Sequence, residues 1–175
     1  MLFRSPVLVS VPSNITVECS AVPLIAVLTA TDNCDTDVKV TSAEVRTDGT
    51  CTDSYVLTRT WTATDNCNNT STASQVITVR DITKPTLVSV PLSITVECSA
   101  VPLIAVLTAT DNCDADVQVT SAEVRTDGLC TDSYVLTRTW TATDNCNNTS
   151  TASQVITVRD ITKPVLVSVP SNIQR

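Results

Sequence analysis

Hydrophobic and polar residues alternate with a period of two along most of this chain, as expected for β-strands with one buried face. In the segment 15–19, Ile15, Val17 and Cys19 fall on one face and polar residues on the other. No segment shows the 3.6-residue period of an amphipathic helix. We therefore predict an all-β fold, and in its first part five strands, at residues 15–19, 24–31, 38–45, 55–63 and 75–80.

The longest of these strands indicates which side chains form the core. Leu57, Trp61 and Ala63 share one face of the 55–63 strand, and Ile77 and Val79 are the inward residues of the last strand. Arg59 lies on the same face as Trp61 and needs a buried partner, either Glu44 or an aromatic ring. Pro12 interrupts the chain before residue 15, which predicts an edge strand that is split in two.

The same pattern then occurs a second time. Residues 6–84 align without a gap with residues 85–163, and only six positions differ. Residues 164–175 begin a third copy, and residues 1–5 are interpreted as cloning-derived. A period of this length has the size of a small domain rather than of a solenoid repeat. We therefore predict tandem antiparallel β-sandwich repeats at 6–84 and 85–163.

Eight cysteines occur at four equivalent positions in each repeat. Zinc binding is rejected because the chain has no histidine and no Cys-x-x-Cys pair. Disulfides remain, and they imply an oxidising compartment and hence an exported protein. Disulfides would also stabilise a domain whose core is small.

The order of the strands predicts how the cysteines pair. If successive strands alternate in direction, Cys34 and Cys67 lie at the N-terminal end of the repeat, and Cys19 and Cys51 lie at the far end. A Cys19–Cys34 bond would have to cross the second strand, about 26 Å long, whereas a disulfide needs Cα atoms within about 7 Å. The predicted disulfides are therefore Cys19–Cys51, Cys34–Cys67, Cys98–Cys130 and Cys113–Cys146.

Charge and residue content exclude several classes of function. A net charge of −7 argues against nucleic acid as a partner. The cysteines are committed to disulfides, and the serines and threonines have no base to activate them, so we expect no enzymatic activity. No stretch approaches the roughly 18 apolar residues of a membrane span.

The end of each repeat carries a family resemblance. The segment from Trp61 to Ser71, WTATDNCNNTS, followed by 76–85, VITVRDITKP, resembles the end of a hyalin-type (HYR-like) repeat, and the opening 11–19, VPSNITVEC, fits the same family. The closest likeness is to the four-cysteine version in giant surface adhesins of gliding Bacteroidetes. The resemblance implies an immunoglobulin-like sandwich and a role in adhesion. Asn68 replaces the usual glycine after the last cysteine, and asparagine tolerates the left-handed conformation.

Acidic loops provide the only candidate binding site, for calcium, which takes six to eight oxygen ligands. In stacked repeats, Asp81 would approach the acidic loops of the second repeat. The alternative is that these side chains cap tight turns. The candidate calcium ligands are Asp32, Asp35, Asp37, Asp65, Asp81, Asp111, Asp114, Asp116 and Asp144.

From these features we expect structural spacer repeats of a large extracellular adhesin on a bacterial cell surface. The alternative is a module that binds a glycan or protein ligand through its loops. Neighbouring repeats of the same chain are the expected partners, and the fragment is expected to be monomeric. We also expect the repeats to form an extended rod, because the chain leaves each repeat at the end opposite to its entry.

Overall fold

The computed structural model describes residues 5–167 and divides into two compact units. Within the described residues, the first unit comprises residues 5–88, 108–119 and 142–150, and the second comprises residues 89–107, 120–141 and 151–167. The first unit therefore contains the first repeat together with three segments of the second repeat, residues 85–88, 108–119 and 142–150. Of the truncated third copy, residues 168–175 lie outside the described part.

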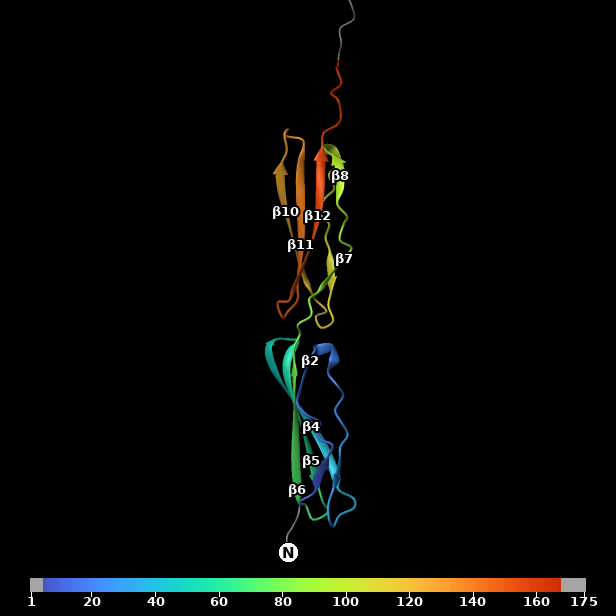
Figure 1. Cartoon of the computed structure of the whole chain (residues 1–175), viewed down its shortest axis with the longest axis vertical. Helices are drawn as coiled ribbons and strands as arrows, with labels where there is room; N and C mark the ends of the chain where they lie inside the picture. The colour runs from blue at the N-terminus through green and yellow to red at the C-terminus, as the bar shows by residue number, and fades with distance from the viewer. Residues whose placement is uncertain (1–4, 168–175) are drawn as a thin grey trace, which may run out of the picture. The chain divides into compact units, whose positions relative to one another are not determined.

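The first repeat is built from two sheets (Figure 1). A four-stranded sheet has the order β2-β6-β5-β4, and a two-stranded sheet pairs β1 with β3. Strands β1 and β2 are the two halves of the strand that Pro12 was predicted to split, and they join different sheets. The elements are β1 (Val7–Val9), β2 (Ile15–Val17), the 3₁₀ helix η1 (Cys19–Ala21), β3 (Thr29–Thr31), β4 (Lys39–Cys51), β5 (Ser54–Thr64) and β6 (Thr70–Val79).

The second repeat has the same arrangement, with the sheets β8-β12-β11-β10 and β7-β9. In both repeats the second half of the split strand runs parallel to the last strand, β2 beside β6 and β8 beside β12. In the first repeat β5 is antiparallel to both β4 and β6, which confirms the predicted all-β sandwich class and, for that repeat, the predicted strand directions. The elements are β7 (Thr86–Val88), β8 (Ile94–Glu97), η2 (Cys98–Ala100), β9 (Thr108–Thr110), β10 (Gln118–Asp127), β11 (Tyr134–Thr143) and β12 (Thr149–Arg159).

The predicted core face of β5 is confirmed. Leu57, Trp61 and Ala63 are buried there, and Ile77 and Val79 of β6 are buried beside them. Ile15 and Val17 of β2 pack against this cluster. The two-residue alternation therefore places one face of the sheet inside and leaves the threonine-rich face outside.

The second predicted strand is much shorter than expected, because side chains take its backbone partners. Only Thr29–Thr31 form a strand, and residues 22–28 are irregular. Arg59 donates to the carbonyl oxygens of Pro23, at 2.7 Å, and Leu24, at 3.2 Å. Trp61 Nε1 donates to the carbonyl oxygen of Ala26 at 2.8 Å. These carbonyl groups are thus satisfied without a neighbouring strand.

Two local expectations are confirmed. Arg59 is buried and finds its partner in Glu44, with Nε 2.6 Å from Oε2. Asn68 has a φ of 64°, the left-handed conformation expected where related repeats carry glycine, and the equivalent Asn147 has a φ of 67°.

The predicted disulfide pairing is wrong, although the cysteines lie at the predicted ends of the strands. None of Cys19–Cys51, Cys34–Cys67, Cys98–Cys130 and Cys113–Cys146 is present. Instead, the first unit contains the bonds Cys19–Cys113 and Cys51–Cys146, with Cα separations of 6.0 and 5.2 Å. Cys19 and Cys51, at the far end of the first repeat, therefore each bond to a loop of the second repeat rather than to each other. The remaining four cysteines are free and exposed.

Within residues 5–167, no helix has the length and apolar character needed to cross a lipid bilayer.

Candidate functional site

Three aspartates come together inside the first unit, in the region that we call the joint, where the end of the first repeat meets two loops of the second. Asp81 follows β6, Asp111 follows β9, and Asp144 follows β11. One carboxylate oxygen from each of them lies within 4.8 Å of the others. The ends of three strands thus place three carboxylates around one point.

Asp81 and Asp144 are buried and Asp111 is half-buried, and none of the three forms an ion pair within residues 5–167. Asp81 and Asp144 are each 5% exposed. The Oδ2 atoms of Asp81 and Asp111 are buried and have no hydrogen-bond partner. The arginine–carboxylate ion pairs found among residues 5–167 lie elsewhere and include none of the three. Because buried anions require compensation, this geometry fits a cation.

The turn-capping interpretation holds at the same residues. Asp111 Oδ1 accepts hydrogen bonds from the backbone N–H groups of Cys113, at 2.9 Å, and Asp114, at 3.1 Å. Asp144 Oδ1 accepts from the backbone N–H groups of Cys146 and Asn148, both at 2.8 Å. In Asp111, one oxygen therefore orders the loop while the unpaired oxygen is left for a ligand.

The crowding of negative charge shifts the pKa of Asp81. Burial, the largest cause, and the neighbouring carboxylates of Asp144 and Asp111 together raise the pKa of Asp81 to about 6. Backbone donation from Thr83 opposes the shift only in part. Without a cation, Asp81 therefore keeps its proton up to a higher pH than an ordinary aspartate does.

Glu18 is a fourth acidic residue at the joint, and the sequence prediction missed it. One of its oxygens lies within 4.8 Å of Asp81. Its Oε1 accepts from the hydroxyl of Thr83 at 2.7 Å and from the backbone N–H of Ile82 at 3.2 Å. Burial opposes ionisation of Glu18, but these hydrogen bonds and one from Asn112 bring its pKa below the usual value. Its position before Cys19, repeated as Glu97 before Cys98, was the available signal.

Amide side chains complete the polar contacts of the joint. Asn112 Nδ2 donates to Ser20 Oγ at 3.2 Å, and Asn148 Nδ2 donates to the carbonyl oxygen of Asp81 at 3.3 Å. Asn145 Nδ2 donates to Asp53 Oδ2 at 2.5 Å. Both loops of the second repeat thus hold the first repeat through hydrogen bonds as well as disulfides.

The other predicted ligands do not join this cluster. Asp114 caps two turns, with Oδ1 accepting from Asp116 N–H and Oδ2 from Asn145 N–H, both at 2.9 Å. Asp116 is not part of the group of three. In the first repeat, Asp35 makes the same capping bonds as Asp114, to the N–H groups of Asp37 and Asn66. Asp65 accepts from Asn69, which lowers its pKa.

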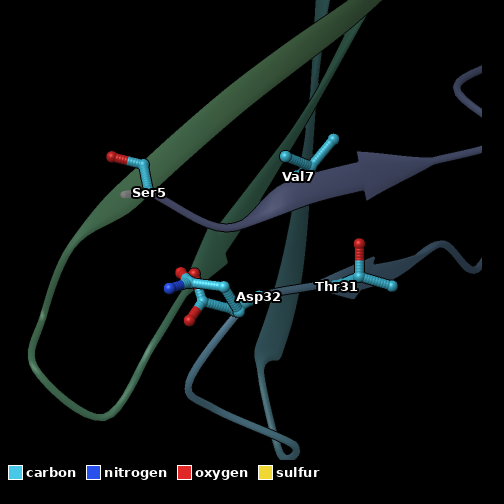
Figure 2. Close-up of a pocket in the computed structure, with 5 residues that line it drawn as sticks. Ser5, Val7, Thr31 and Asp32 are labelled. Atoms are coloured by element: carbon cyan, nitrogen blue, oxygen red, sulfur yellow. The ribbon is translucent and has the colours of Figure 1, made fainter. Parts of the chain in front are cut away.

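Asp32 is the first-repeat equivalent of Asp111, and it borders an open hollow (Figure 2). Figure 2 shows Thr31 and Asp32 at the end of β3 and Ser5 and Val7 at the start of β1. The hollow has a volume of about 250 Å³, and Asn33 also lines it. Asp32 Oδ2 is buried without a hydrogen-bond partner, as in Asp111. This end of the repeat thus has the form of a joint with one side open.

Comparisons with known proteins give structural likeness only. No protein-family model and no curated protein matches the sequence. Similar solved structures include Drosophila N-cadherin EC1-4, 12% identical with a TM-score of 0.39, and human CDH23 EC21-23, 16% identical with a TM-score of 0.40. The match covers 90% of this chain in both cases, but 50% of the first structure and 70% of the second. Human mucin-like protocadherin EC1-2 is 14% identical, with a TM-score of 0.35, over 86% of this chain and 98% of that one. At these scores the likeness assigns neither a family nor a function to the chain.

Proposed function

We propose that this chain is a piece of the structural spacer of an exported cell-surface adhesin, in which consecutive repeats are joined covalently into an extended array. The observation that carries this proposal is the pair of disulfides Cys19–Cys113 and Cys51–Cys146, each linking one repeat to the next. A spacer must transmit force without separating its domains. Two covalent bonds beside the linker at residues 81–84 serve that purpose.

Three further features support this role. Disulfides persist in oxidising compartments, which supports an extracellular location. The near identity of the two repeats favours a spacer, because recognition loops are expected to differ between copies. The resemblance to hyalin-type repeats supports the context of a bacterial adhesin, including those of gliding species.

We also propose that the joint binds calcium. The fitting donors are the carboxylates of Asp81, Asp111 and Asp144, with Glu18 beside them. Calcium prefers carboxylate oxygens and would compensate the two buried, unpaired Oδ2 atoms. Bound calcium would supply the positive charge that holds the three strand ends together.

Calcium should raise the melting temperature at pH 7.4 and have a much weaker effect at pH 5. At a concentration 100 times the Kd, the gain is about 2.7 kcal/mol, or about 5–10 °C for a chain of this size. At pH 5 a proton competes for Asp81, whose pKa is raised to about 6 by burial and by the neighbouring Asp144 and Asp111. Differential scanning calorimetry with calcium or a chelator at both pH values tests this expectation.

In the calcium-free protein, binding of a proton to Asp81 stabilises the folded state relative to the unfolded state. Because the folded pKa of Asp81, about 6, exceeds the ordinary 3.8, the folded state binds more protons between these values. This stabilising contribution is complete below about pH 4 and is lost as the pH rises through 6. The Asp81→Asn variant should lose both the calcium response and this pH dependence. Asp160→Asn, at the equivalent exposed position of the second repeat, should keep both. Equal behaviour of the two variants would contradict the calcium site.

Ligand recognition is the second candidate function, and one observation favours it. Leu24 and Val27 are 94% and 97% exposed on the irregular segment 22–28, and Leu103 and Val106 are equally exposed in the second repeat. A screen of glycan arrays and cell-surface proteins with the oxidised chain distinguishes the two functions. For a spacer we expect no specific binding. A ligand whose binding is lost in Leu24→Ser/Leu103→Ser, but not in Val45→Ser/Val124→Ser, would establish recognition instead.

A further inference from the structure

The four free cysteines occupy the same positions as the four bonded ones. When the two repeats are aligned, the free Cys98 and Cys130 correspond to the bonded Cys19 and Cys51. The free Cys34 and Cys67 correspond to the bonded Cys113 and Cys146. Each end of the chain therefore carries one half of the double disulfide that is complete at the joint.

We propose that these two half-sites are complementary, so that a second copy of this chain is joined head to tail through the disulfides Cys98–Cys34 and Cys130–Cys67. The proposal goes beyond the spacer function, since it concerns assembly between separate chains. It depends neither on calcium nor on the absence of a ligand.

The half-site of the first repeat already has the geometry of the bonded one. Cys34 N–H donates to Asp32 Oδ1 at 2.9 Å, and Cys113 N–H donates to Asp111 Oδ1 at the same distance. Asn33 Nδ2 lies 3.2 Å from Cys34 Sγ, whereas the matching distance from Asn112 to Cys113 is 3.1 Å. This loop therefore needs no rearrangement to form its bond.

The second loop of this half-site is ordered in the same way. Cys67 N–H donates to Asp65 Oδ1 at 2.9 Å, and the Cys67 Sγ lies 3.4 Å from Asn66 Oδ1. The bonded Cys146 has corresponding distances of 2.8 and 3.3 Å. Both thiols of the first half-site are thus held in the conformation in which their equivalents are oxidised.

The hollow in Figure 2 is the non-covalent part of this half-site. Asn33 lines it, and its equivalent Asn112 contacts Glu18 and Ser20 of the preceding repeat. The corresponding acceptors at the other end of a second chain are Glu97 and Ser99. The open hollow is therefore where the end of another repeat fits.

The half-site of the second repeat has two parts, around Cys98 and around Cys130. The part around Cys98 has the same structure as its bonded equivalent around Cys19. The 3₁₀ helix η2, which begins at Cys98, repeats η1, and Glu97 accepts from the Ile161 N–H as Glu18 does from that of Ile82. The other part differs, because Cys51 ends β4 whereas Cys130 lies beyond the end of β10. We expect the hairpin around Cys130 to take the β4 conformation when the bond forms.

The oxidant in the proposed reaction is a small-molecule disulfide such as glutathione disulfide. A cysteine thiolate attacks one of its sulfur atoms, forming a mixed disulfide and releasing one glutathione thiolate. The partner cysteine thiolate then attacks the protein sulfur and releases the second glutathione. Each protein disulfide thus consumes one glutathione disulfide, and two cysteine thiols lose their protons and two electrons.

Two blocked variants test the proposal. Cys34→Ser/Cys67→Ser keeps only the C-terminal half-site, and Cys98→Ser/Cys130→Ser keeps only the N-terminal one. Each variant is incubated alone, and both are mixed, near millimolar concentration in a glutathione redox buffer, to approach the effective concentration of linked domains. We expect at least tenfold more covalent dimer in the mixture than in either variant alone. The unmodified chain should form a ladder of longer oligomers.

Peptide mapping of the mixed dimer under non-reducing conditions should find Cys98–Cys34 and Cys130–Cys67. Comparable dimer in a single variant, crossed bonds such as Cys98–Cys67, or only monomer in the mixture would overturn the proposal. These outcomes are independent of the glycan and protein binding screen, so failure of one proposal is distinguishable from failure of the other.

Discussion

Replacing Cys113 and Cys146 by serine should lower the free energy of unfolding by about 4–5 kcal/mol or more. The Cys19–Cys113 bond spans 94 residues of sequence, and in the chain-entropy model a loop of that length is worth about 4.6 kcal/mol. The Cys51–Cys146 bond adds a further constraint across 95 residues. Guanidinium chloride unfolding without reductant measures the loss.

The chain contains a matched control for this experiment. Cys34→Ser/Cys67→Ser changes the equivalent positions of the first repeat, where both cysteines are free. We expect that variant to be as stable as the unmodified chain. With a reducing agent present, all three proteins should unfold at the same denaturant concentration. A loss of stability in the control equal to that in Cys113→Ser/Cys146→Ser would instead support the disulfides within each repeat that the sequence predicted.

The same bonds should limit extension under force. With Cys19–Cys113 intact, the shortest covalent path through the chain bypasses residues 20–112. Since an extended residue spans about 3.3–3.6 Å, reduction should lengthen the fully stretched chain by about 300 Å. Single-molecule pulling of the oxidised and reduced chain measures this difference, which is the mechanical property that a spacer requires.

The strand pattern was predictable from the sequence because it depends on local alternation. The positions of Leu57, Trp61 and Ala63 on the buried face followed from their spacing, and so did the split strand at Pro12. The left-handed Asn68 followed from the resemblance to hyalin-type repeats, which usually carry glycine at that position. Such features depend on neighbours in sequence, so one repeat contains the information that determines them.

The partners of the cysteines depend on contacts that one repeat does not contain. Placing Cys19 and Cys51 at one end of the repeat and Cys34 and Cys67 at the other was sound. That placement is compatible with two kinds of disulfide: one between the two cysteines at the same end of a repeat, and one between cysteines of consecutive repeats. Four cysteines per repeat allow either kind, and the structure has the second. The second kind is possible because the repeat recurs along the chain, which the local residue pattern of one repeat does not show.

The number of aspartates at the calcium site was overestimated for a similar reason. Nine aspartates were candidates, but three meet in one group. Asp35 and Asp114 have both oxygens occupied by backbone N–H groups, which residue type alone does not reveal. The irregular segment 22–28 was unpredictable in the same way, since side chains of Arg59 and Trp61 replace a neighbouring strand.

Trp61→Ala should destabilise the first repeat by about 3–5 kcal/mol. The Trp61 side chain is 1% exposed, and its removal leaves a large cavity on the buried face of β5. It also leaves the carbonyl oxygen of Ala26 without the donor that lies 2.8 Å away. Denaturant unfolding followed by far-UV circular dichroism measures the loss, and Trp140 fluorescence reports on the second repeat.

Two comparisons separate the contributions of packing and hydrogen bonding. Trp61→Phe keeps most of the buried ring but removes Nε1–H, so we expect an intermediate loss of about 1–3 kcal/mol from the unpaired carbonyl and the smaller ring. Val45→Ala removes a 62% exposed side chain from the neighbouring strand and should change stability by less than about 0.5 kcal/mol. A similarly small loss for Trp61→Ala would mean that the ring does not hold the segment 22–28. In that case the second sheet of each repeat would have to be stabilised by the pairing of β1 with β3, whose three-residue strands present few hydrogen bonds for that purpose.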